Sequence, residues 1–295
     1  YLLKKIGTSI ARPLADFFTA FMSVGQVPSE WRTAIITPLY KKGSASDCVN
    51  YRPISLTCCI CKVMERIITS EMSSFLRDHG VISKQQHGFI ARRSTTTNLL
   101  ESLNDWTIAM KNKQSVTVAY IDYSKAFDVV SHSKLYLKLA GCGIGGCLLD
   151  WIKSWLTGRT QITRVGHCLS RVKPVTSGVP QGSCLGPLLF LLYINDVCSI
   201  FNSRGYCQLY ADDVKLYSVF DAVAGDETSL QDNLARLKRW SDTWQLTMSV
   251  SKCACLNIGS SLSTRQEYCV GRQTLMQVQK YKDLGVTMDA SLKFK

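Results

Sequence analysis

The sequence predicts an α+β fold, because helical patterns dominate its first 113 residues and short buried strands follow them. Apolar residues recur at helical spacing in three segments, at 8–24, 58–77 and 94–113. Three later runs are short, β-branched and aromatic, as buried strands are: 115–121, 207–210 and 214–220. The 295 residues, 46% of them hydrophobic, are enough for one large domain or two small ones around a packed core.

Composition excludes several classes of protein and favours one class of partner. The apolar content excludes a disordered chain, and no apolar run is long enough to span a membrane. The first residues lack the pattern of a secretory signal. With 35 Lys and Arg against 22 Asp and Glu, the net charge of +13 favours nucleic acid as a partner. The 13 cysteines lack zinc-ligand spacing, so we expect reduced core thiols in an intracellular protein.

The elements follow one another with recognisable signals at their ends. The helix over 58–77 ends near Gly80, and the helix over 94–113 has Ser94 or Thr95 as its N-cap. Helical spacing returns over 131–156, interrupted at 141–146, and residues 164–175 have the composition of a strand. The Gly- and Pro-rich segment SGVPQGSCLGP then forms a turn that opens an apolar helix at Pro187.

Three carboxylates follow the predicted strands. Asp122 comes directly after the strand over 115–121, whereas Asp212 and Asp213 lie with Ala211 between two runs that form a β-hairpin. An isolated Asp pair in a turn is usually a solvated turn, but here the flanking runs are hydrophobic enough to bury the hairpin. Neighbouring buried carboxylates repel one another unless divalent cations offset their charge. Two Mg²⁺ ions held in this way catalyse phosphoryl transfer, so the sequence predicts nucleotidyl transfer.

Three motifs contain or flank the residues described above: YIDYSKAFD (120–128), SGVPQGS (177–183) and YADD (210–213). They resemble the palm motifs of reverse transcriptases and follow one another in the same order. The flanking segments resemble LINE-type retrotransposons, which lack long terminal repeats: NYRPISL (50–56), QHGFIARRST (86–95), GPLLFLLYIND (186–196) and KDLGV (282–286). The resemblance implies a right-hand polymerase fold with fingers, a mostly antiparallel palm sheet and no thumb. It places an N-terminal extension at 1–32, a reverse transcriptase domain at 33–287 and the truncated start of a following region at 288–295. Within the domain it places the fingers mainly in 33–118 and the palm mainly in 119–287.

The resemblance also implies roles for single residues in the palm. Asp122 and Asp212 match the catalytic metal-binding aspartates, and Asp213 matches the neighbouring carboxylate, which supports them in catalysis and metal binding. Phe127 matches the steric gate that excludes a ribose 2′-OH, although it also fits an ordinary core aromatic. Gln181 and Gly182 match the motif beneath the templating base pair, or they simply build the turn before Pro187.

Basic residues match further positions of the family. Arg52 and Lys62 match finger residues that meet the incoming triphosphate, and Arg92 and Arg93 belong to a finger motif that touches the template backbone. Lys252 matches the lysine that protonates the leaving pyrophosphate, although Ser249 stands where the family often has Asn. Residues 278–281, together with KDLGV, resemble the hairpin that grips the primer end.

The implied activity is RNA-directed DNA polymerisation with two Mg²⁺ ions, for which Mn²⁺ is a substitute. Its partners are an RNA template, a DNA primer and deoxynucleoside triphosphates, and its implied place of action is the nucleus. RNA-directed RNA synthesis is a second hypothesis, which the bulky Phe127 opposes. A third is a catalytically inactive retroelement-derived fragment that acts only as an RNA-binding module, with no need for metal or for the carboxylates.

Overall fold

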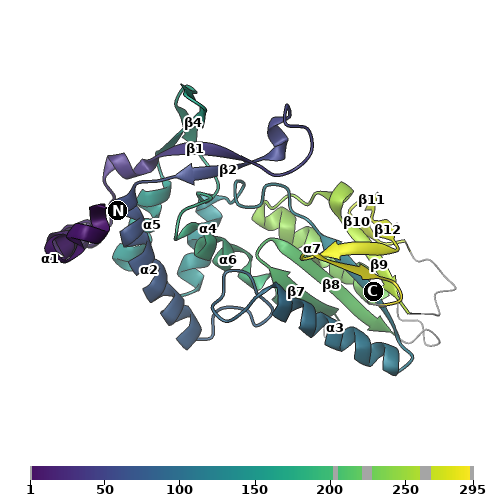
Figure 1. Cartoon of the computed structure of the whole chain (residues 1–295). Coiled ribbons are helices and arrows are strands. Elements are labelled where there is room, and N and C mark those ends of the chain that lie inside the picture. Colours follow the sequence, from purple (N-terminus) through teal and green to yellow (C-terminus); the bar gives the residue numbers. More distant parts are fainter. Residues whose placement is uncertain (1, 202–204, 221–227, 260–266, 293–295) are drawn as a thin grey trace. The chain divides into compact units, whose positions relative to one another are not determined.

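The computed structural model describes residues 2–201, 205–220, 228–259 and 267–292, which divide into two compact units (Figure 1). The first unit consists of Tyr1–Val81 and Phe127–Tyr193, and the second of Ile82–Ala126 and Ile194–Lys295. Each unit is therefore built from two separate segments of the chain. The fingers and palm boundaries expected from the motifs stay a prediction, and residues 293–295 of the expected following region lie outside the described residues.

The first unit combines helices with a small sheet. Its elements are α1 (Leu2–Ser23), η1 (Ser29–Arg32), β1 (Thr33–Tyr40), η2 (Cys48–Asn50), β2 (Tyr51–Leu56), α2 (Cys59–Asp78), α4 (His132–Gly141), α5 (Gly146–Leu156), β4 (Arg159–Val165), β5 (Cys168–Leu169), β6 (Lys173–Val175) and α6 (Gly186–Ile194). The sheet has the order β2-β1-β4-β5, and β6 also pairs with β4. Only the β1–β4 pair is parallel.

Glycines in left-handed conformations separate neighbouring helices and strands of this unit, at positions where the hydrophobic periodicity of the sequence changes. Gly143 (φ +81°) and Gly146 (φ +57°) separate α4 from α5, as the interrupted pattern predicts. The single strand predicted over 164–175 is wrong, because Gly166 (φ +58°) turns the chain back on itself. Three short strands, β4, β5 and β6, take its place.

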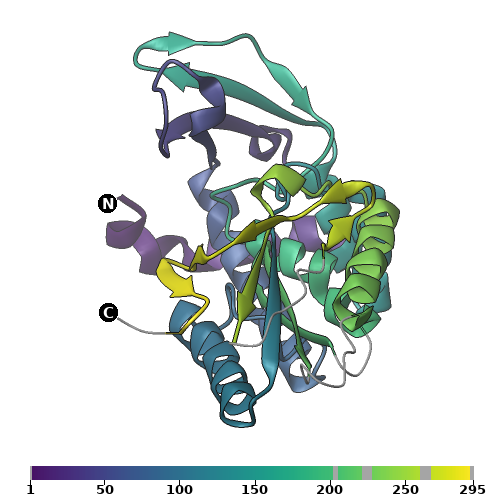
Figure 2. The same cartoon turned by 90° about the vertical axis from the view of Figure 1, so that its right-hand side faces the viewer.

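The second unit is a sheet with a helix on each face. Its elements are α3 (Thr95–Lys111), β3 (Ser115–Ile121), η3 (Asn195–Ile200), β7 (Gly205–Tyr210), β8 (Asp213–Phe220), α7 (Thr228–Trp244), η4 (Val250–Lys252), β9 (Ala254–Ile258), β10 (Cys269–Val270), β11 (Gln273–Thr274), β12 (Met276–Val278), β13 (Lys280–Asp283) and β14 (Val286–Asp289). The main sheet has the order β12-β9-β3-β8-β7, with only β12–β9 parallel. Figure 2 shows α3 and α7 on opposite sides of these strands.

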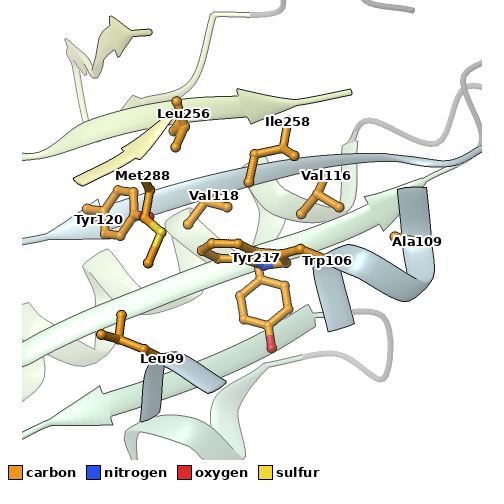
Figure 3. Close-up of a cluster of buried hydrophobic side chains, with 10 residues drawn as sticks. All are labelled: Leu99, Trp106, Ala109, Val116, Val118, Tyr120, Tyr217, Leu256, Ile258 and Met288. Atoms are coloured by element: carbon orange, nitrogen blue, oxygen red, sulfur yellow. The ribbon is translucent and has the colours of Figure 1, made fainter. Parts of the chain in front are cut away.

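The core of the second unit lies between α3 and the sheet (Figure 3). Trp106 of α3 is fully buried against alternate residues of β3, Val116 and Val118, and meets the Tyr217 ring edge-on at 5.8 Å. Every residue of β3 is buried, as expected of a central strand covered on both faces. Burial of both faces fixes the register of β3, and with it the position of the residue that follows the strand.

The N-cap of α3 is as predicted. The Ser94 hydroxyl accepts a hydrogen bond from the Thr97 backbone N–H, and the Thr97 hydroxyl accepts one from the Ser94 backbone N–H, which completes a capping box. Among the described residues, no helix combines the length and apolar character that a membrane span requires.

Candidate active site

The three predicted carboxylates lie at one end of the second unit's sheet. Ile121, the last residue of β3, pairs with Val214 of β8, so Asp122 and Asp213 continue adjacent strands at the same level. In the hairpin, Tyr210 pairs with Asp213. The loop therefore has two residues rather than the three predicted, with Ala211 at φ +54° followed by Asp212. The sheet thus brings together the acids that the sequence singled out.

Asp122 has the surroundings of a cation ligand. Its Oδ1 is buried and accepts no hydrogen bond among the described residues, although the Lys252 ammonium lies 3.6 Å away and the Asp122 side chain as a whole is 36% exposed. A buried carboxylate oxygen is costly unless a charge or a donor satisfies it. The described residues contain no group of three His, Cys, Asp or Glu side chains placed to hold an ion. Mg²⁺ needs only one or two protein carboxylates when substrate phosphates complete its shell, so this donor set fits the ion.

Lys252 lies beside Asp122. Its Nζ is 3.6 Å from Asp122 Oδ1, while its side chain remains 64% exposed. The short helix η4 sets this distance, because the Ser249 N–H donates to the Asp122 carbonyl at 2.8 Å. The Asp122 N–H in turn contacts Cys253 Sγ at 3.4 Å. The lysine ammonium is therefore close to the Asp122 carboxylate and open to solvent.

The hairpin of β13 and β14 borders the same carboxylates. Tyr281 stacks on Tyr120 with ring centroids 3.8 Å apart. Burial, followed by the charges of Asp213 and Asp122, raises the pKa of Tyr281 to about 12. A pocket of about 80 Å³ opens here, with Asp213, Tyr281 and Asp283 among its lining residues. The segment that resembles a primer-gripping hairpin therefore does form a hairpin, and it lies beside the acids.

A buried ion pair that sequence reasoning missed attaches this hairpin to the sheet. Lys215 Nζ lies 2.7 Å from Asp283 Oδ2, and both side chains are almost fully buried. The sequence signal was a lysine inside the otherwise apolar run VKLYSVF, since a buried lysine requires an acidic partner. The partner itself lies 68 residues further along the chain and has no local sequence signal.

The other predicted palm residues lie together in the first unit. Phe127 is half-buried and stacks on Phe190 with ring centroids 4.2 Å apart. Gln181 Nε2 donates to Asp128 Oδ1 at 2.9 Å, and the Gln181 carbonyl accepts from the Ser55 N–H at 2.7 Å. Gly182 has φ +101°, and a Cβ there would lie 2.9 Å from the Ser55 carbonyl oxygen. This close approach requires a glycine.

Glu65 is a second buried acid that sequence reasoning missed. Its Oε2 accepts from the backbone N–H groups of Cys184 and Leu185, at 2.7 and 3.3 Å, just before α6 begins. It therefore fixes the end of the turn that carries Gln181 and Gly182. The only sequence signal was its position as an acid on the apolar face of the helix α2. In the structure this acid is buried and not solvated.

The predicted basic residues differ in their surroundings. Arg52 is exposed on β2, and Lys62 is half-buried in the first turn of α2. In the second unit, Arg92 is exposed, whereas Arg93 donates to the backbone carbonyls of Lys84 and Gln86. Arg93 thus stabilises the loop that precedes α3.

Comparison with known proteins decides the family. The sequence model described as "Reverse transcriptase (RNA-dependent DNA polymerase)" matches residues 39–288. The chain belongs to the reverse transcriptase family. The motif resemblance is confirmed by relatives from mobile elements of Drosophila melanogaster. The chain is 30% identical over 288 residues to the RNA-directed DNA polymerase from mobile element jockey, covering 95% of this chain and 31% of that protein. It is also 30% identical over 286 residues to the probable RNA-directed DNA polymerase from transposon X-element, with coverage of 94% and 31%.

Solved structures confirm the predicted fold class of this reverse transcriptase chain. Apo telomerase from Candida tropicalis, truncated from its C-terminal domain, matches 97% of this chain and 60% of its own, with a TM-score of 0.60 and 13% identity. Telomerase from Candida tropicalis in complex with a fragment of telomeric RNA matches with a TM-score of 0.57 and 11% identity, covering 97% and 49%. The α+β polymerase fold with a mostly antiparallel palm sheet is therefore confirmed. The chain spans about a third of the length of the curated relatives it matches.

Proposed function

We propose that this chain catalyses RNA-directed DNA synthesis, adding deoxynucleotides to a primer 3′-OH on an RNA template. The observation that carries the proposal is Asp122, whose buried Oδ1 lacks a hydrogen-bond partner among the described residues and lies 3.6 Å from Lys252 Nζ. Asp213 lies on the adjacent strand at the same level, directly after Asp212. Membership of the reverse transcriptase family and the printed names of the relatives support this activity.

In this mechanism the carboxylates hold the cations and Lys252 supplies a proton. Asp122 and Asp212 would bind two Mg²⁺ ions, with Asp213 as the neighbouring ligand and Mn²⁺ as a substitute. The bound ions would polarise the α-phosphate and offset the charge that develops on it. The primer 3′-OH gives its proton to water as its oxygen forms a bond to the α-phosphorus, and the bond from that phosphorus to the β-phosphate oxygen breaks. Lys252 is placed to donate a proton to the departing pyrophosphate.

The residues of the first unit select and orient the nucleotide in this proposal. Phe127, held by its stack on Phe190, excludes the 2′-OH of a ribonucleotide. Gln181 and Gly182 form a rigid backbone turn beneath the templating base pair. Arg52 and Lys62 bind the triphosphate, as a planar fork and a point charge respectively.

The nucleic acid partners are an RNA template and a DNA primer. The sheet of the first unit supports this, because several basic side chains on its strands and connections are exposed: Lys41, Lys42, Arg52, Arg164, Arg171 and Lys173. Phosphate neutralisation by such residues releases counterions, so template affinity should fall steeply with salt. Copying into chromosomal DNA would place the protein in the nucleus.

Primer extension on an RNA template tests the proposal. The 295-residue chain is given Mg²⁺ and deoxynucleotides, and Asp212→Asn is compared with Asp232→Asn, a matched change at an exposed acid of α7. Asp212→Asn preserves side-chain size but removes the charge that binds the cation, so it should abolish extension. Asp232→Asn should leave extension unchanged. Undiminished synthesis by Asp212→Asn would refute the assignment, and RNA binding without any metal-dependent extension would favour the RNA-binding module.

A further inference from the structure

Gln86 lies against the hairpin that carries the predicted catalytic acids. It precedes α3 and is only 2% exposed. Its backbone extends the sheet, because the His87 N–H donates to the Leu209 carbonyl at 2.9 Å and the Leu209 N–H donates to the Gln85 carbonyl at 3.0 Å. Gln86 and Leu209 thus form a parallel bridge at the edge of β7. Gln86 is therefore fixed beside Leu209, which lies two residues before the loop that begins at Ala211.

The side-chain amide of Gln86 pairs with both polar groups of Ala211. The Ala211 N–H donates to Gln86 Oε1 at 2.9 Å, and Gln86 Nε2 contacts the Ala211 carbonyl oxygen at 3.4 Å. The Gly88 N–H donates to the same Oε1 at 2.7 Å. Ala211 has φ +54°, a conformation that non-glycine residues rarely adopt unless their surroundings enforce it. The amide therefore contacts the peptide units on both sides of the Ala211 Cα, and the second of these joins Ala211 to Asp212.

The backbone around Gln86 allows little adjustment of this contact. A Cβ on Gly88 would lie 2.3 Å from the Ala211 nitrogen, so the two backbone segments are in direct contact. Arg93 donates to the Gln86 carbonyl at 2.8 Å, and Asn98 Nδ2 donates to the Leu209 carbonyl at 3.1 Å. Side chains from outside the hairpin therefore hold the backbone of both Gln86 and Leu209, the two residues of the parallel bridge.

We propose that Gln86 is a positioning residue, which sets the place of Asp212 relative to Asp122 and so tunes the affinity for divalent cations. This inference rests on the proposed function, in which Asp212 is a metal ligand. Groups that orient metal ligands without touching the ion typically change metal affinity or activity about 10- to 100-fold when they are removed. Gln86 would act in this way through the backbone of Ala211, which its side-chain amide contacts at both the N–H and the carbonyl oxygen.

The chain contains a matched control for this clamp. Gln231 of α7 contacts the backbone of one residue in the same manner, since its Oε1 accepts from the Cys269 N–H at 2.8 Å and its Nε2 donates to the Cys269 carbonyl at 3.0 Å. Cys269 lies in β10 and not in the hairpin of β7 and β8. Gln86→Met and Gln231→Met therefore remove the same chemical contact at two places in one unit.

The test measures Mn²⁺ binding by water-proton relaxation in the 295-residue chain, without nucleic acid, together with the Mg²⁺ dependence of primer extension. Gln86→Met should weaken Mn²⁺ binding about 10- to 100-fold. It should also raise the Mg²⁺ concentration for half-maximal rate and leave KM for deoxynucleotide unchanged. Gln231→Met should change neither cation measurement, whatever it does to the melting temperature. Gly88→Ala, which keeps the amide but displaces Ala211, should reproduce the cation effect.

A purely structural role would give a different result. In that case Gln86→Met and Gly88→Ala would lower the melting temperature with no change in Mn²⁺ affinity or Mg²⁺ half-saturation, and the proposal would be overturned. Failure of the proposed function is distinguishable, because Asp212→Asn would then retain full synthesis and Mn²⁺ affinity.

Discussion

The buried ion pair between Lys215 and Asp283 gives a quantitative prediction for the stability of the second unit. The two charged atoms are 2.7 Å apart, and the side chains are only 5% and 8% exposed. Burial lowers the pKa of Lys215, which the charge of Asp283 opposes. Lys215→Met or Asp283→Leu leaves the other charge buried without its partner, so each should lower the free energy of unfolding by about 3–5 kcal/mol.

The double variant separates the charge effect from packing. Lys215→Met combined with Asp283→Leu leaves no buried charge, so its unfolding free energy should return to within about 1 kcal/mol of the unaltered protein. The ammonium also lies 5.5 Å from the Trp106 ring centroid, an attraction of about 1 kcal/mol that both single and double variants at Lys215 lose. Urea unfolding measures these differences, and hydrogen exchange in β8 and β13 shows where stability is lost.

The exposed pair of Lys153 and Asp150 serves as the control. Its atoms are 2.9 Å apart, but the side chains are 43% and 59% exposed. Asp150→Ala should therefore cost no more than about 1 kcal/mol. The reasoning is refuted if the single variants at the buried pair cost no more than this control, or if the double variant is destabilised by the sum of the two singles.

Three further predictions concern a buried histidine, a buried acid and the steric gate. Burial lowers the pKa of His87 below 6.5, so the unfolded chain binds more protons and stability should decrease as the pH falls through 6.5. His87→Asn should flatten this decrease in pH-dependent urea unfolding, and an unaltered slope would contradict the assignment. Glu65→Leu leaves the Cys184 N–H unpaired and should cost about 1–3 kcal/mol in unfolding, whereas Glu71→Leu at an exposed site of α2 should cost little. Phe127→Ala should raise ribonucleotide incorporation relative to deoxynucleotide about tenfold or more in primer extension; unchanged sugar discrimination would remove Phe127 from the gate.

Local sequence patterns were sufficient to predict the features that depend on residues close together in the sequence. The strand over 115–121 has the predicted bounds, because a run of β-branched and aromatic residues suits a strand buried on both faces. Ser94 caps α3 through atoms three residues away. Asp212 and Asp213 could be placed together because a two-strand hairpin is a local feature, whereas the proximity of Asp122 depends on the pairing of β3 with the distant β8, for which the order of the motifs was the guide.

Contacts between distant segments were beyond the sequence. Nothing near Lys215 identifies Asp283 as its partner, and nothing near Gln86 identifies Ala211, which lies 125 residues away. The strand predicted over 164–175 was wrong because its residues favour extended structure, while the left-handed Gly166 permits a reversal that composition alone does not show. These pairings depend on which strands become neighbours in the fold.

The central claim is that the carboxylates at the end of β3 and β8 catalyse RNA-templated DNA synthesis. The most direct measurement is the rate of a single deoxynucleotide addition to a DNA primer on an RNA template, started by adding Mg²⁺, for the unaltered chain and for Asp122→Asn. We expect addition that requires Mg²⁺ and the RNA template and is lost in Asp122→Asn. Addition at an equal rate in Asp122→Asn, or without any divalent cation, would contradict it.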